Sequence, residues 1–153
     1  MMDRRHVLIL AGAALVAGPA RAIEPVQVTV YKDPSCGCCG AWADHIRKAG
    51  YKVTVIDEPE INPLKGRLGV PSSLMSCHTA EIGPYVLEGH VPSAALARLL
   101  AEKPAIRGLA VPGMPVGSPG MEVEGTEPEI YDVMAFGSGE PKSFMRFKGG
   151  SPL

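Results

Sequence analysis

The sequence predicts a single α/β domain with appendages, and three observations carry that prediction. Its 153 residues are enough for one domain of ordinary size and too few for two. Strand-like and helix-like segments alternate between residues 26 and 102, which is typical of α/β proteins. With 18 Gly and 15 Pro, the chain is rich in turns, and this composition disfavours a coiled coil or an all-helical bundle.

The first elements predict a strand, a helix and a second strand. Residues 26–31 are β-branched and alternating, which favours a strand. Residues 39–49 repeat apolar side chains at helical spacing before Gly50, a typical helix stop. Residues 51–56 predict the second strand, so the unit implies a right-handed parallel crossover. Residues 62–69 then predict a short helix.

A β-hairpin and a third helix follow. Residues 77–82 and 85–90 are strand-like runs separated by Gly-Pro. A tight hairpin returns its second strand to the start of the first, so we expect Cys77 and His90 to lie together. A helix begins near Ser93 and ends at Glu102. The resulting order, β-α-β-α-β-β-α, is that of the thioredoxin-like fold, which places its redox site between the first strand and first helix.

The two ends of the chain are predicted to lie outside this domain. Arg4 and Arg5 precede a short apolar run and Ala20-Arg21-Ala22, the pattern of an export signal of the Sec or twin-arginine route. Residues 108–125 are rich in Gly, Pro and Met, which predicts an irregular loop before a terminal β-hairpin. The expected divisions are an export signal (1–22), a thioredoxin-like metal-binding domain (23–103) and a C-terminal extension covering the site (104–153).

The charge and hydropathy of the sequence limit where the protein is expected to be located and what it is expected to bind. Fifteen basic side chains stand against 16 acidic ones, so no basic face predicts a nucleic-acid partner. The apolar run near the start is too short to cross a bilayer comfortably, since crossing needs about 20 residues. We therefore expect a periplasmic protein without a stable membrane anchor after signal cleavage.

Four cysteines carry the strongest functional signal. Cys36, Cys38 and Cys39 lie within four residues at the predicted start of a helix, where backbone N–H groups and the helix dipole favour thiolates. Cys77 approaches the same end of the sheet if its strand pairs antiparallel with the first strand. An exported chain favours structural disulfides, yet so short a loop satisfies one good pairing only.

Four convergent thiolates predict a soft-metal site. Soft sulfur ligands select Cu(I), Zn(II) or an iron-sulfur cluster, and in an exported protein copper is the metal most in need of handling. Zinc stays an alternative on ligand count. His78, His90, Met114 and Met121 are candidate additional ligands or neighbours of the ligands. His45 is interpreted as a surface or packing residue.

Several ordered motifs carry a family resemblance: KDPSCGCCGAW at 32–42, VP at 70–71, SCHTA at 76–80, EGHVP at 88–92 and GLAVPGMPVGSPGME at 108–122. The chain resembles the exported C-x-C-C metal-binding proteins of CopG-type copper resistance, long labelled a domain of unknown function. The resemblance implies a thioredoxin-like domain and several copper ions bridged by thiolates, with a role in interconverting Cu(I) and Cu(II). Its implied copper ligands are Cys36, Cys38, Cys39 and Cys77.

The residues leave three functions open. The first is a copper-binding protein that sequesters copper or changes its oxidation state, with a copper efflux system or a periplasmic redox partner beside it. The second is a thiol-disulfide oxidoreductase with Cys36 as nucleophile and Cys39 as resolving thiol. The third is a copper carrier without redox activity. Whether the chain is an enzyme, for instance a copper oxidoreductase, stays undecided at this point.

Overall fold

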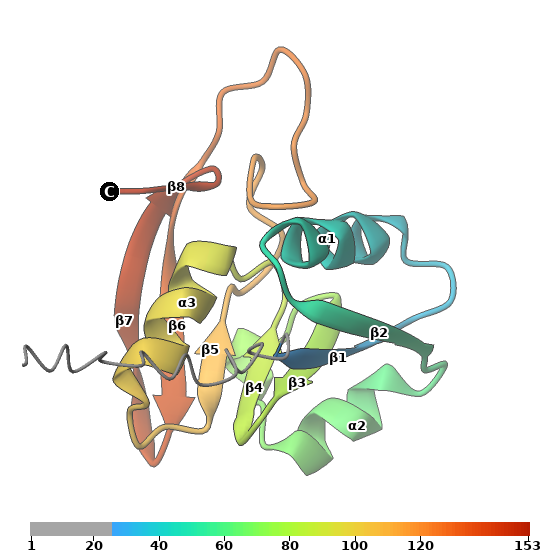
Figure 1. The fold of residues 1–153 in the computed structure, drawn as a ribbon, viewed down its shortest axis with the longest axis vertical. Helices are drawn as coiled ribbons and strands as arrows, with labels where there is room; N and C mark the ends of the chain where they lie inside the picture. Colours follow the sequence, from blue (N-terminus) through green and yellow to red (C-terminus); the bar gives the residue numbers. More distant parts are fainter. Residues whose placement is uncertain (1–25) are drawn as a thin grey trace, which may run out of the picture.

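The computed structural model describes residues 26–153, which form one mixed eight-stranded sheet with three α-helices and a short 3-10 helix (Figure 1). The predicted export signal, residues 1–22, lies outside the described residues. Among residues 26–153 we find no helix with the length and apolar character that a membrane crossing requires.

The sheet runs in the order β2-β1-β3-β4-β5-β6-β7-β8. The strands are β1 (Gln27–Lys32), β2 (Lys52–Asp57), β3 (His78–Ile82), β4 (Tyr85–Glu88), β5 (Gly108–Ala110), β6 (Ile130–Gly137), β7 (Gly139–Lys148) and β8 (Ser151–Pro152). The helices are α1 (Gly37–Lys48), α2 (Ile61–Leu68), the 3-10 helix η1 (Ser72–Leu74) and α3 (Ser93–Glu102).

The predicted order of elements up to α3 is confirmed. β1 pairs parallel with β2 and antiparallel with β3, and β3 and β4 form the expected hairpin. One boundary differs in a way that matters, because α1 begins at Gly37 rather than at Cys39. The Cys36 N–H donates to the carbonyl of Asp33, which closes the preceding turn early. Cys38 therefore lies in the first helical turn, as Cys39 does, instead of in a loop.

The prediction that residues 108–125 are irregular throughout is wrong at its start. Gly108–Ala110 forms β5, which pairs parallel with β4 and antiparallel with β6. Gly108 permits this pairing, since a Cβ there would lie 1.9 Å from the carbonyl oxygen of Val86. The predicted terminal hairpin is confirmed as β6 and β7, and β5 joins it to the same sheet as the first strands.

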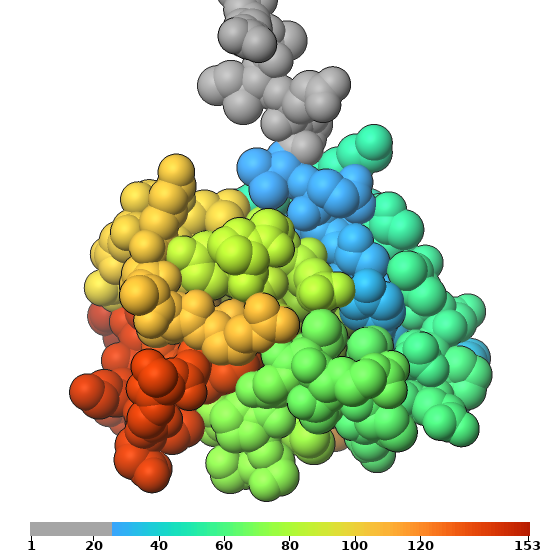
Figure 2. All heavy atoms as spheres, turned by 90° about the horizontal axis from the view of Figure 1, so that it is seen from below, coloured from blue at the N-terminus to red at the C-terminus, as the bar shows by residue number. Residues whose placement is uncertain are grey.

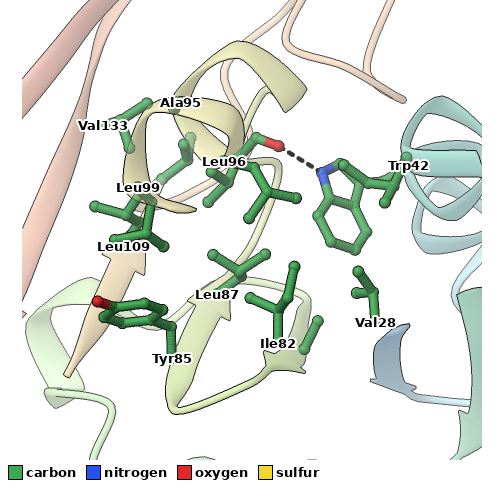
Figure 3. Packing of buried hydrophobic residues seen from close by; sticks show 14 of the residues in the cluster. Val28, Trp42, Ile82, Tyr85, Leu87, Ala95, Leu96, Leu99, Leu109 and Val133 are labelled. Carbon is green, nitrogen blue, oxygen red and sulfur yellow. Dashed lines mark hydrogen bonds between the residues drawn. The ribbon is translucent and has the colours of Figure 1, made fainter. Parts of the chain in front are cut away.

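Two apolar clusters cover the two faces of the sheet. On one face, α1 and α3 pack on side chains such as Val28, Leu87 and Leu109. On the other, η1 packs with the neighbouring residues Val86 and Ala110. Figure 3 shows the first cluster, in which the indole N–H of fully buried Trp42 donates to the carbonyl of Val91 at 2.9 Å. This bond connects α1, which contains Cys38 and Cys39, to the segment leading into α3.

Arg107 stabilises the end of the sheet that contains the β3–β4 turn. Its guanidinium donates to the carbonyls of Leu68 and Pro84, at 2.7 and 3.3 Å. Figure 2 shows this end, where the green α2 segment, the yellow-green β3–β4 turn and the orange residues before β5 pack together. The cysteines lie toward the other end of β3.

Candidate metal centre

A tight turn presents the cysteines between β1 and α1. The Asp33 carboxylate accepts the backbone N–H of Ser35 at 2.8 Å and also its hydroxyl, and these bonds lower the pKa of Asp33. Cys36 has an extended backbone and stands immediately before the first helical residue. Cys39, in the first turn of α1, is fully buried. The sequence thus folds locally so that three sulfurs gather at one helix N-terminus.

The four sulfur atoms converge as the sequence predicts. Cys36 and Cys39 form a disulfide, with their Cα atoms 5.6 Å apart, and Cys38 and Cys77 remain thiols. The Cys38 Sγ lies 3.6 Å from that of Cys36 and 3.9 Å from that of Cys77. All four sulfur atoms lie within 4.8 Å of one another. The antiparallel pairing of β1 and β3 produces this convergence.

Cys77 also belongs to a second group of donors, with His78 and His90. Its Sγ lies 3.0 Å from the Nε2 atom of His90 and 3.2 Å from the Nδ1 atom of His78. The open end of the β3–β4 hairpin brings Cys77 and His90 together, which confirms the prediction. Cys77 is therefore common to an all-sulfur group and to a mixed sulfur and imidazole group.

Hydrogen bonding fixes the orientation of the His90 ring. Its Nδ1 lies 2.8 Å from the carbonyl oxygen of Pro119. A carbonyl only accepts, so Nδ1 carries the proton and the Nε2 lone pair of the neutral ring faces Cys77. Metal-binding histidines characteristically donate their other N–H in this way. His78 differs, since within residues 26–153 its buried Nε2 has no hydrogen-bond partner.

Burial keeps this group neutral in the absence of metal. Burial, with the charge of Cys38 second, raises the pKa of Cys77 to about 12. Burial also lowers the pKa of His90, and lowers that of fully buried His78 well below its ordinary value. Binding of a metal ion by Cys77 must therefore displace the thiol proton, which makes binding weaker as the pH falls.

The segment 111–129, which we call the site loop, packs against the first two turns of α1, where Gly120 meets the backbone of Cys38 and Trp42. Gly120 packs so closely that a Cβ there would lie 2.9 Å from the carbonyl oxygen of Cys38. Gly120 also has φ +87°, which favours glycine. The two predicted methionines differ: Met114 is 52% exposed, whereas Met121 is half-buried beside Gly120. Their role as ligands stays a prediction.

Behind the site lies a buried ion pair that the sequence analysis missed. The Glu88 carboxylate accepts from the Lys65 ammonium and from the backbone N–H of Ser76, both at 2.6 Å. The hydroxyl of Thr79 donates to its second oxygen. Ser76 and Thr79 flank Cys77 and His78, so Glu88 holds the ends of the segment that carries both donors. The available signal was Glu88, a charged residue in an otherwise apolar strand.

His45 has a structural role at the start of α3. Its Nε2 accepts the backbone N–H of Ser93 at 3.1 Å, because Pro92 before it offers no capping side chain. It lines a hollow of about 320 Å³ with residues that include Asp44, Lys48 and Glu122. This position agrees with its interpretation as a packing residue rather than a ligand.

Protonation of His45 is expected to weaken the fold in acid. Burial lowers the pKa of His45; the Glu122 carboxylate opposes this shift and the Lys48 ammonium adds to it. As the pH falls, His45 is therefore protonated in the unfolded chain before it is protonated in the folded chain. The free energy of unfolding decreases once the pH falls below about 6.5, the pKa of an unfolded histidine, and continues to decrease until the pH reaches the lower pKa of folded His45. Urea unfolding at pH 7.5 and pH 5 should show a larger loss for the wild type than for His45→Gln.

The glutamine variant is the matched control, because its side-chain oxygen can accept the same N–H and does not titrate. His45→Ala removes the cap at both pH values and should lower the free energy of unfolding by about 1 kcal/mol at pH 7.5. Equal acid losses in the wild type and His45→Gln would refute the titration of His45 as the cause.

The assembled donors suit a soft metal ion. Thiolates select Cu(I) or Zn(II), and imidazole nitrogen binds copper and zinc alike. The disulfide withdraws two of the four sulfurs, and its reduction would make all four available. The arrangement can thus bind metal, exchange disulfides, or couple the two.

Comparisons with known proteins bear on the choice. A family model described as a protein of unknown function, DUF411, matches residues 74–121, which include Cys77, His90 and Pro119. Form 1 of the copper resistance protein CopG is 42% identical, with a TM-score of 0.75, and the match covers 82% of this chain and all of that one. Form 2 of the same protein is also 42% identical, with a TM-score of 0.76, and the match covers 81% of this chain and 99% of that one. Curated proteins give no significant match.

Proposed function

The chain belongs to the DUF411 family of CopG-like proteins, and from this premise we propose that it is a periplasmic copper-binding protein of copper resistance. Cys36, Cys38, Cys39 and Cys77 hold several Cu ions through bridging thiolates. The protein sequesters this copper or changes its oxidation state. A thioredoxin-like arrangement of residues 23–103, with residues 104–153 as an extension over the site, accords with the order of the strands and helices.

One observation carries the proposal: soft donors from two separate elements face one another. Three sulfurs come from the α1 N-terminus and the fourth comes from Cys77, the residue before β3, all within 4.8 Å. We expect the sulfurs to bridge copper ions, because four sulfur atoms are too few to give several ions complete, separate coordination shells. His90 adds an imidazole lone pair that already faces Cys77 at 3.0 Å.

Anaerobic titration of the reduced chain with Cu(I), followed by desalting, metal analysis and thiol counting, tests the function. We expect more than one copper per chain and loss of reactive thiols. Cys38→Ser should retain fewer copper ions, while its circular dichroism stays that of the wild type because Cys38 is only half-buried. A reduced chain that retains no copper would refute the proposal, and unchanged copper in Cys38→Ser would refute the role of Cys38.

The Cys36–Cys39 disulfide favours a second candidate, a thiol-disulfide oxidoreductase. A disulfide at a helix N-terminus has the placement of a redox-active pair, in which Cys36 would be the nucleophile and Cys39 the resolving thiol. Rapid metal-free reduction of insulin, undiminished in Cys38→Ser, would select this function over copper binding.

A further inference from the structure

We propose that Cys36 and Cys39 together supply two electrons that reduce Cu(II) to Cu(I) at the neighbouring donors of Cys77 and His90. The inference rests on the proposed function, since it requires copper at this site. Cys36 and Cys39 can bind copper, as proposed above, only while both are thiols; in this step they supply electrons, and the remaining donors hold the copper.

The disulfide divides the donors into two sets. It removes Cys36 and Cys39 from metal binding, but it leaves Cys38 and Cys77 as thiols. The group formed by Cys77, His78 and His90 contains neither sulfur of the disulfide. The oxidised chain therefore still offers a thiol, its imidazole neighbours and Cys38 to a copper ion.

The remaining donors suit both oxidation states of copper. Imidazole nitrogen is a good ligand for Cu(II), and thiolate sulfur favours Cu(I). The Nε2 lone pair of His90 is aimed at Cys77 because Pro119 holds the Nδ1 proton. A Cu(II) ion can thus enter at the imidazole end, and the Cu(I) ion formed from it finds sulfur ligands without leaving.

Sulfur atoms connect the dithiol to these donors. From Cys36 to Cys38 the Sγ atoms are 3.6 Å apart, and from Cys38 to Cys77 they are 3.9 Å apart. Copper bound to Cys77 therefore lies within a few ångströms of the dithiol through a single intervening thiol. Within this cluster the disulfide joins Cys36 to Cys39, and Cys38 and Cys77 are free thiols. Cys36 and Cys39 are therefore the pair whose oxidation the geometry favours.

The step balances with copper as the oxidant. Each of two Cu(II) ions accepts one electron and becomes Cu(I). The S–H bonds of Cys36 and Cys39 break, their two protons pass to solvent, and the S–S bond forms between the two sulfurs. Because both cysteines belong to the start of α1, the bond forms within one helical turn. The Cu(I) product remains on Cys38, Cys77 and His90.

The test adds Cu(II) sulfate stepwise to the reduced chain without oxygen. Paramagnetic resonance counts the Cu(II) that remains, and alkylation with peptide mass mapping locates the disulfide. We expect two Cu(II) ions to be reduced per chain, a persistent Cu(II) signal from the third, and a disulfide between Cys36 and Cys39. The double variant Cys36→Ser/Cys39→Ser should reduce Cu(II) at least about tenfold more slowly.

Cys38→Ser separates the electron source from the connecting sulfur. It should slow the reduction, yet reach the same two electrons per chain and the same mapped disulfide. A disulfide between Cys38 and Cys77, or wild-type rates in the double variant, would overturn the inference. The disulfide is mapped in the wild-type chain, so this part of the test does not depend on whether a variant folds. The Cu(I) titration above tests the proposed function separately, because a chain can bind Cu(I) fully and still fail to reduce Cu(II).

Discussion

Replacing Cys77 by serine is expected to weaken Cu(I) binding by more than about 100-fold, since even residues that merely orient metal ligands contribute about 10- to 100-fold. Cys77 is the residue that the all-sulfur group and the mixed group share. Cys36, Cys38 and Cys39 all come from one turn, so without Cys77 a copper ion has sulfur on one side only. Competition with a Cu(I)-selective chelator measures the loss.

Met75→Leu is the matched control for this variant. Met75 is a soft ligand type two residues from Cys77, but it is half-buried and packs with the cluster of Val70 and Leu74. Leucine conserves its volume, so copper affinity should stay within about twofold, as expected for a change that conserves core packing. Strong copper binding by Cys77→Ser, or a large loss in Met75→Leu, would contradict the ligand set proposed here.

Glu88→Gln should lower the free energy of unfolding by about 3–5 kcal/mol, the usual effect of removing one partner of a buried ion pair. Lys65 and Glu88 are 1% and 0% exposed, so the variant leaves an ammonium group in the interior without a counter-charge. This is a large part of the stability of a typical domain. Urea denaturation compares the variant with the wild type.

Two further variants identify the cause. Lys65→Met should destabilise less than Glu88→Gln, because the carboxylate keeps donors from Ser76 and Thr79. The double variant Lys65→Met/Glu88→Gln should recover most of the loss, since it buries no charge and its amide oxygen still accepts the N–H of Ser76. Additive effects of the two substitutions would mean that the ion pair is not what stabilises this part of the fold.

Sequence reasoning predicted much of the candidate site because local patterns place its parts. The turn at Gly83-Pro84 sets the hairpin, and the hairpin brings Cys77 to His90. The crossover from β1 to β2 fixes the direction of the first strand, so the cysteines meet Cys77 once β3 pairs antiparallel. Each of these steps depends on spacing along a short stretch of chain.

Features that depend on distant segments were not predictable in this way. β5 has three residues, two of them small, and it becomes a strand because β4 and β6 lie on its two sides. Lys65 meets Glu88 across 23 residues, and a lysine on a short helix looks like an exposed side chain until the packing is known. The cap from His45 to Ser93 spans 48 residues. Tertiary packing decided each of them.

The anchoring of the site loop determines where the chain can vary in length. Residues 117–121 are held from both sides, because Pro119 binds His90 and the N–H of Gly117 donates to the carbonyl of Met121. A deletion there would shift Pro119 away from His90. Residues 122–127 are exposed, so an insertion adds chiefly loop entropy, about 0.6 kcal/mol for each doubling of length. Insertions and deletions among homologous chains should therefore accumulate at residues 122–127 and leave the number of residues between Cys77 and Pro119 unchanged.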